Sequence, residues 1–282
     1  MMESGRLDKD MISQPELWRL VLLVGADRLD VALYPPVARE EMVWRSFPYD
    51  QAAESPLKAL EDIVYDNPLL LCDFRRVDCL LDNNATLLMP AGMEPSAIAA
   101  MMRAVDADAP AGEAPDESML DIYPAGAYNA EAVTERDDDL TAFLRRTFYN
   151  IRFDSRLAML CRYFLGESTG TKQHRVYVPV RRNRLTVIAF DGDSLLMAND
   201  FRFTSDIDAA YYIMASLSNL GIDPAEADIN VGTVGASSEE LTSILRRYIP
   251  SLRPLPFPTL RYRASKSTLQ APYELIIRPL CE

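Results

Sequence analysis

Glycine-containing turns are the places in this chain where a phosphate group could bind. Gly25 and Asp27 follow the apolar run Leu20–Val24, and Gly232 and Gly235 lie three residues apart ahead of a predicted helix. Glycine lets backbone N–H groups approach a phosphate closely, and a helix N-terminus attracts anions. A strand-to-helix turn is the simpler explanation of the second glycine pair. The pattern therefore predicts either a nucleotide contact or a turn.

Other residue types with catalytic potential are sparse. His174 is the only histidine, and its polar neighbours predict an exposed strand entry rather than the base of a nucleophilic triad. Asp137–Asp139 is typical of a helix start, where the macrodipole favours acids. Asp191, Asp193 and Asp200 flank a predicted hairpin and could hold magnesium, although Asp191-Gly192 is more simply a turn. The four cysteines form no Cys-x-x-Cys pair and no P-loop is present, so we assign no catalytic residue and no metal ligand.

Composition and charge narrow the classes of function. The chain has 282 residues, enough for two domains, and a net charge of −13. An acidic surface repels phosphate backbones, so nucleic acid is not an expected partner. Residues 1–14 are polar without a signal-peptide core, and the longest apolar runs are too short to span a bilayer. We therefore expect a cytoplasmic protein with no membrane span.

The second half of the chain has a clear order of predicted elements. Alternating apolar residues indicate strands, and capping residues followed by a 3.6-residue apolar period indicate helices. The predicted strands are Val176–Val180, Arg184–Phe190, a third strand that follows the Asp191-Gly192 turn and ends at Phe201, and Asp228–Val234. One predicted helix is capped by Thr204 or Ser205 and ended by Gly221, and a second has capping-box spacing at Ser237 and Glu240.

The first half contains a less regular copy of the same order, from about Leu20 to Val105. A further helix is expected at Ser155–Leu165, and the polar stretch Gly166–Gln173 is the predicted boundary between the halves. The predicted domain division is a polar N-terminal extension at 1–16, a first subdomain with an insertion at 17–165, and a second subdomain at 166–282 that includes the closing element Tyr273–Leu280.

The repeated order of hairpin, strand, helix, strand and helix resembles the actin-like ATPase superfamily, which includes actin, Hsp70, sugar kinases and the PilM-like and GspL-like bacterial assembly proteins. Val176–Ile249 and the closing Tyr273–Glu282 also resemble a bacterial family of uncharacterised proteins with a domain of unknown function. The resemblance implies an α/β fold with two duplicated actin-like, ribonuclease H-like subdomains, whose mixed sheets are flanked by helices around a central cleft.

The resemblance also implies where a nucleotide would lie. Active members hold Mg-ATP with an Asp-x-Gly turn in each hairpin; here Leu23 stands at the first carboxylate position, and the second turn has neither an acid nor a glycine. Arginine can bind phosphate, but its bulk keeps the backbone away. The residues implied for a degenerate nucleotide cleft are Gly25, Asp27, Arg181, Gly232 and Gly235.

Loss of both hairpin carboxylates makes hydrolysis an unexpected function. The leading hypothesis is a non-catalytic interaction or scaffold protein with an unidentified protein partner, or a second copy of the chain as a homodimer. No cofactor is expected. One alternative is a switch that binds Mg-ATP without rapid hydrolysis; another is a phosphotransferase of the sugar-kinase type, for which the sequence lacks a convincing general base at the expected place. Basic residues concentrate in the second half, which suits either ordinary solvated charge or an acidic partner.

Overall fold

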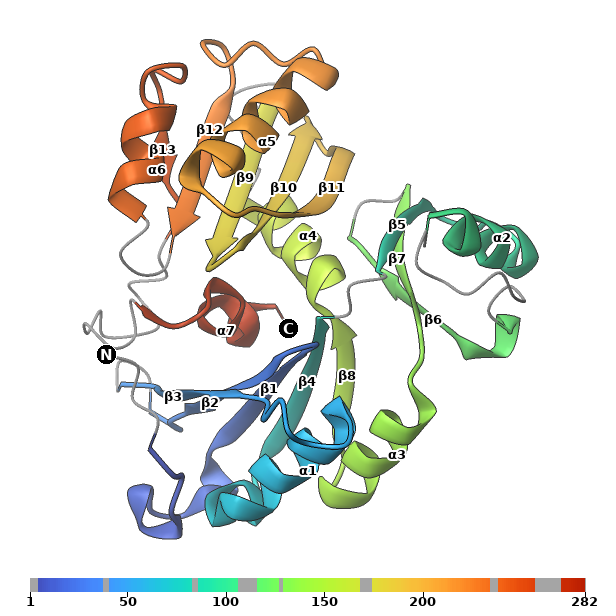
Figure 1. The fold of residues 1–282 in the computed structure, drawn as a ribbon, viewed down its shortest axis with the longest axis vertical. Helices are drawn as coiled ribbons and strands as arrows, with labels where there is room; N and C mark the ends of the chain where they lie inside the picture. Colours follow the sequence, from blue (N-terminus) through green and yellow to red (C-terminus); the bar gives the residue numbers. More distant parts are fainter. Residues whose placement is uncertain are drawn as a thin grey trace.

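Two five-stranded sheets with the same strand order lie one above the other (Figure 1). The structure is a computed structural model that describes residues 5–37, 41–82, 86–105, 116–126, 129–167, 174–233, 238–256 and 270–281. The first sheet has the order β3-β2-β1-β4-β8 and the second has the order β11-β10-β9-β12-β13. In each sheet, three antiparallel strands are followed by two parallel ones. The predicted duplication is therefore confirmed.

The first lobe consists of the first sheet and the two helices on its outer face. Its elements are β1 (Arg19–Gly25), β2 (Arg28–Tyr34), β3 (Val43–Pro48), α1 (Pro56–Asp66), β4 (Arg76–Asp82), α3 (Asp138–Thr147) and β8 (Arg152–Ser155). A small third sheet, in the order β5-β7-β6, is inserted between β4 and α3. It is built from β5 (Leu87–Pro90), α2 (Pro95–Val105), β6 (Leu120–Pro124) and β7 (Ala130–Glu135).

The second lobe consists of the second sheet and its helices. Its elements are β9 (His174–Arg181), β10 (Arg184–Asp191), β11 (Ser194–Arg202), α5 (Asp206–Asn219), β12 (Asp228–Thr233), α6 (Ser238–Leu245) and β13 (Arg253–Pro254). Two further helices, α4 (Arg156–Glu167) and α7 (Tyr273–Ile277), lie between the lobes (Figure 1). Short 3₁₀ turns occur at Lys9–Met11, Pro15–Leu17, Pro68–Leu71, Glu117–Met119 and Arg278–Leu280.

Local capping explains where the helices begin and end. Ser55 accepts a hydrogen bond from Lys58 N at the start of α1. Ser205 and Asp208 form a reciprocal capping box on α5. Gly221, with φ of +67°, ends α5 in a left-handed conformation that favours glycine. The predicted boundaries of α5 at Ser205 and Gly221 are confirmed, whereas Ser237 of the other predicted capping box lies outside the described residues.

One element differs from the sequence prediction. The helix expected at Ser155–Leu165 begins at Arg156, and a strand, β8, precedes it. The missed strand is short and polar, and it forms because it pairs in parallel with β4. Pairing with a distant strand is information that local alternation does not carry.

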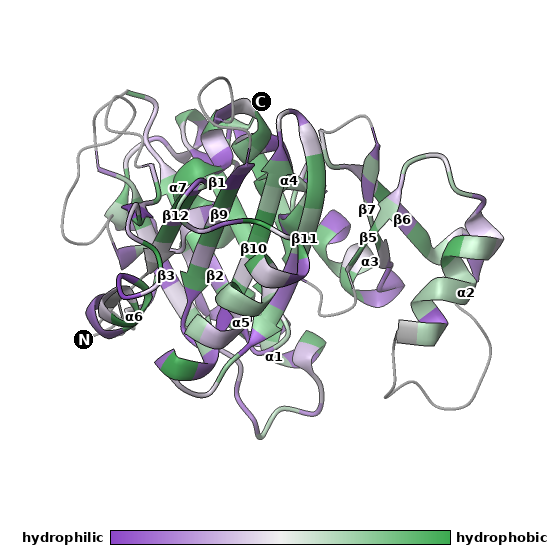
Figure 2. Cartoon of the chain, turned by 90° about the horizontal axis from the view of Figure 1, so that it is seen from above, coloured by the Kyte–Doolittle hydropathy of each residue, from purple (hydrophilic) through white to green (hydrophobic). Residues whose placement is uncertain are grey.

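Three apolar cores hold the lobes and join them. The first lies beneath α1 and α3, and the second lies beneath α5 and α6. Figure 2 shows strands β9 and β10 of the second sheet as largely hydrophobic. The third core lies between the lobes, where the Phe164 ring of α4 stacks on Tyr177 at 4.3 Å and on Tyr273 at 5.8 Å between centroids. The two helices between the lobes are therefore packed against the second sheet through a buried aromatic contact.

The closing segment of the chain contacts both lobes. Arg278 forms an ion pair at 3.0 Å with Asp78 of β4, and Tyr34 of β2 donates a hydrogen bond to the carbonyl of Leu275. These contacts attach the segment to the first sheet, and its predicted place in the second subdomain stays a prediction. The division near residue 166 remains a prediction, and most of Gly166–Gln173 lies outside the described residues. In the part of the chain that the structure describes, no helix combines the length and hydrophobicity needed to cross a membrane.

Candidate functional site between the two lobes

Two hairpin turns face each other between the lobes. The first turn joins β1 to β2 and begins at Gly25, and the second joins β9 to β10 with Arg181 and Arg184 at its ends. Arg181 forms an ion pair across the cleft with Asp82, which ends β4. Asp82 lies opposite Gly25 in the parallel register of β1 and β4. Strand pairing therefore places a carboxylate beside the first turn and an arginine on the second.

Arg156 is the centre of the contacts between the lobes. It opens α4 directly after β8, and its side chain is 5% exposed. Its Nε donates to Asp82 Oδ1 at 2.6 Å, and its Nη2 donates to both carboxylate oxygens of Asp200. Its Nη1 donates to Thr186 Oγ1 and to Glu274 Oε1, both at 3.0 Å. All five N–H donors of this guanidinium group therefore have acceptors.

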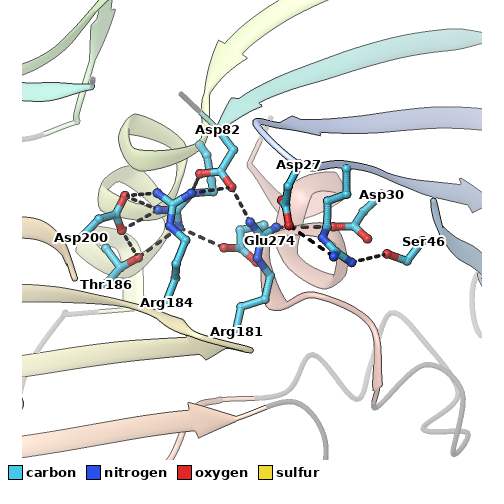
Figure 3. Close-up of polar contacts among 11 residues, drawn as sticks. Asp27, Asp30, Ser46, Asp82, Arg181, Arg184, Thr186, Asp200 and Glu274 are labelled. Atoms are coloured by element: carbon cyan, nitrogen blue, oxygen red, sulfur yellow. Dashed lines mark hydrogen bonds and ion pairs between the residues drawn. The ribbon is translucent and has the colours of Figure 1, made fainter. Parts of the chain in front are cut away.

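Equal numbers of opposite charges make up this group, which we call the interlobe cluster (Figure 3). Its members are Arg156, Arg181, Arg184, Asp82, Asp200 and Glu274. Both oxygens of Asp82 are engaged, Oδ1 by Arg156 and Oδ2 by Arg181 and Arg184. The carboxylates come from β4, β11 and α7, so the cluster joins both sheets and the closing segment.

Burial and charge act in opposite directions on two carboxyl groups of the cleft. Burial alone would raise the pKa of Asp82, but the guanidinium groups of Arg156, Arg181 and Arg184 hold that pKa well below its usual range. Burial raises the pKa of Asp30 on β2, and the charge of Arg181, 3.5 Å away, a hydrogen bond with Ser46 and the charge of Arg28 offset this only in part. The surroundings therefore stabilise the ionised form of Asp82 and destabilise the ionised form of Asp30.

The family of this chain follows from its match to a family model. Residues 8–252 match the model described as "Protein of unknown function (DUF3822)". The chain belongs to this family. No curated protein matches the sequence of this DUF3822 chain.

Solved structures identify the fold of the DUF3822 chain. A crystal structure from Bacteroides thetaiotaomicron, described as a protein with an actin-like ATPase fold and unknown function, superposes with a TM-score of 0.68 at 17% identity, covering 87% of this chain and 94% of that chain. A PilM–PilN type IV pilus biogenesis complex superposes with a TM-score of 0.57 at 14% identity, covering 95% of this chain and 98% of that chain. The predicted resemblance and fold class are therefore confirmed.

The structure separates the residues that the resemblance implied for a nucleotide cleft. Gly25 and Arg181 are brought close together through Asp82. The side chain of Asp27 is 78% exposed, and its ion pair is with neighbouring Arg28. A Cβ atom on Gly232 would lie only 2.3 Å from a side-chain carbon of Leu255, so this glycine is needed for packing. Gly235 lies outside the described residues.

Asp82, Arg156 and Glu274 define the site but are not predicted from the sequence. Asp82 ends a buried strand, and carboxyl ends of parallel strands commonly bear functional groups, so this position had a usable signal. Arg156 and Glu274 lie in apolar helices with no local motif. Asp200 was considered as a magnesium ligand, but the structure pairs it with arginines. In the described part of the chain, no group of histidine, cysteine and acidic residues is arranged to hold a metal ion.

A cavity of about 460 Å³ opens on the first lobe beside the first turn, and Asp82 of the interlobe cluster forms part of its lining. It lies between the first turns of α1 and α3, at the carboxyl ends of β1 and β4. Its walls are mainly apolar with a polar rim, and they are formed by Val24, Gly25, Ala26, Tyr49, Pro56, Leu57, Leu60, Asp82, Thr134, Glu135, Arg136, Asp137 and Leu140. Its volume falls within the usual range for small-molecule sites.

Proposed function

We propose that this DUF3822 protein is a non-catalytic interaction or scaffold protein that uses an actin-like ATPase fold with its nucleotide cleft closed by its own side chains. The observation that carries the proposal is the complete engagement of Asp82 by three arginines. Both oxygens of this carboxylate are bound to guanidinium groups, which leaves it little capacity to coordinate magnesium or to orient an attacking water.

The energetics of the interlobe cluster support the same conclusion. A nucleotide phosphate that took one of the arginines would leave a buried carboxylate without its partner. Breaking a buried ion pair in this way costs about 3–5 kcal/mol. A nucleotide would have to offset that cost before any net binding appeared, so we propose that the protein has no resident cofactor.

The proposed partner is another protein, in the cytoplasm. The PilM–PilN structure is, by its description, a complex of one such fold with a second protein. This likeness supplies an analogy of fold only. A second copy of the chain is the alternative partner, and light scattering across a range of concentrations distinguishes a monomer from a homodimer.

The decisive experiment for the proposal is nucleotide turnover and thermal melting of the purified full chain with Mg-ATP and Mg-ADP. We expect no turnover and no shift of the melting temperature. Steady Mg-dependent turnover that disappears in Asp27→Ala, a change at an exposed carboxylate, would overturn the proposal. Asp206→Ala, at another exposed acid on the first turn of α5, is the matched control for surface charge.

The cavity beside Gly25 favours one second candidate, the nucleotide-binding switch without rapid hydrolysis. Ligand at a hundred times its dissociation constant would stabilise the fold by roughly 2.7 kcal/mol. A saturable upward shift of the melting temperature without turnover would therefore select the switch over the scaffold. The sugar-kinase type of phosphotransferase is disfavoured, because the carboxylate opposite Gly25 is fully paired and unable to act as a general base.

A further inference from the structure

Glu274 reaches the interlobe cluster from the closing segment of the chain. It is 2% exposed, and its Oε1 accepts a hydrogen bond from Arg156 at 3.0 Å. Its helix, α7, has only five residues. The other two carboxylates of the cluster belong to sheet strands. Glu274 is thus the one carboxylate of the cluster whose backbone belongs to neither sheet.

The rest of the closing segment holds α7 in place between the lobes. Arg278 forms ion pairs with Asp78 at 3.0 Å and Asp154 at 3.6 Å on the first sheet. The hydroxyl of Tyr273 donates to the carbonyl of Pro256, which follows β13. The segment therefore spans the cleft and is attached on both sides of it.

Glu274 is less completely bound than the other partners of Arg156. Its second oxygen, Oε2, is buried and has no hydrogen-bond partner among the described residues, and the same holds for Arg181 Nη1 and Asp30 Oδ1. The guanidinium group of Arg181 lies between Glu274 and Asp30 in Figure 3. A buried polar atom without a hydrogen-bond partner costs free energy, and this cost opposes the docking of the closing segment between the lobes. The guanidinium groups of Arg156 and Arg181 thus favour a carboxylate at this position, but the carboxylate of Glu274 is held there through a single hydrogen bond.

We propose that Arg156, beside Arg181, forms a carboxylate-binding site whose ligand is supplied by the chain itself. Residues 270–281 then act as a strap that closes the cleft when Glu274 is bound. When the Glu274 carboxylate is absent, the site accepts a small carboxylate from solution. This site is independent of whether the protein is a scaffold or a switch, because it uses no nucleotide.

Chemical rescue of Glu274→Ala in the full chain tests the site. We expect the variant to melt below the wild type, and sodium acetate to raise its melting temperature along a saturable curve. Sodium chloride at the same ionic strength should not reproduce the curve. Wild-type protein, in which Glu274 fills the site, should show no saturable component. Equal effects of acetate and chloride on the variant, or rescue by inorganic phosphate alone, would overturn the proposal.

Hydrogen exchange of Glu274→Gln tests the strap even where the alanine variant does not fold. Glutamine keeps the shape of the side chain but removes the charge from its bond to Arg156. Exchange of the amides of Leu275 and Ile276, which bond to the carbonyl of Pro272, should become roughly tenfold faster or more, as expected for the loss of a charge-assisted hydrogen bond. Glu226→Gln, at an exposed position, is the matched control. If the α7 amides of Glu274→Gln exchanged at the wild-type rate, that result would contradict the strap.

Discussion

Replacing Arg156 by methionine gives the sharpest test of the interlobe cluster. Methionine fills much of the space of arginine but donates no hydrogen bond. The change leaves Asp82, Glu274 and Asp200 without a shared cation, and the first two of these side chains are 1% and 3% exposed. Water cannot readily replace the lost donors at such positions. The expected result is a large loss of stability without a change of fold.

The magnitude follows from the burial of the partners. Removing one member of a buried ion pair costs about 3–5 kcal/mol, mostly because the remaining charge is left uncompensated. Arg181 and Arg184 still contact Asp82 in the variant and limit the loss at that carboxylate. We therefore expect about 3 kcal/mol, a large part of the roughly 5–15 kcal/mol that stabilises an ordinary domain.

The pH dependence distinguishes this mechanism from simple loss of packing. The native pKa of Asp82 lies below its unfolded value of about 3.9, so the associated stabilisation is complete above that value and is lost as the pH falls through the native pKa. Removing Arg156 moves the native pKa of Asp82 upward. The difference in free energy of unfolding between wild type and variant should therefore shrink as the pH falls below about 4.

Urea unfolding of both proteins at neutral and acidic pH measures the effect. Arg145→Met is the matched control, because Arg145 is an exposed residue of α3 that lies over the Phe153 ring at 5.4 Å. That contact is worth at most about 1 kcal/mol. A loss in Arg156→Met no larger than in Arg145→Met, or a loss that is the same at every pH, would refute the charge-compensation argument.

Three further predictions concern other buried positions. Asp30→Asn should raise the urea midpoint, because the change removes a carboxylate that burial disfavours, and the gain should grow as the pH rises from the unfolded pKa of about 3.9 towards the raised native pKa of Asp30 and stay constant above it; a lower midpoint would contradict this. Gly232→Ala should cost about 1–3 kcal/mol in urea unfolding, because its Cβ would meet Leu255, whereas Gly166→Ala, with open space around it, should change stability far less. Burial raises the pKa of Cys161 to about 12, so mass spectrometry should find that thiol unlabelled by iodoacetamide until the chain unfolds.

The duplicated topology was predictable because its signals are local. Alternating apolar residues mark the hairpin strands, and Ser55, Ser205 and Gly221 mark helix ends through bonds to neighbours a few residues away. The four-residue β8 was not predictable in this way. Its sequence, Arg-Phe-Asp-Ser, has no apolar alternation, and β4 supplies its pairing from more than seventy residues upstream.

The candidate site was predictable only in outline. The hairpin turns directed attention to Gly25 and Arg181, which the structure brings close together. The same reasoning favoured Asp27, because it is adjacent in sequence to the turn. The carboxylate that faces Gly25 is instead Asp82, which arrives by strand pairing, and the partners of Arg156 lie 30 to 118 residues away along the chain. Contacts over such separations leave no periodic trace in a single sequence.

The charge balance of the interlobe cluster explains why a cleft of this fold can close without a ligand. Clefts that hold Mg-ATP present carboxylates whose charge is compensated by a bound metal ion. In this chain the compensating cations are guanidinium groups attached to β9, β10 and α4. Because these cations are covalently part of the fold, their positions do not depend on the concentration of any solute. Closure of the lobes should therefore be insensitive to magnesium and nucleotide, and it should depend instead on Arg156 and on the carboxylate that α7 brings to it.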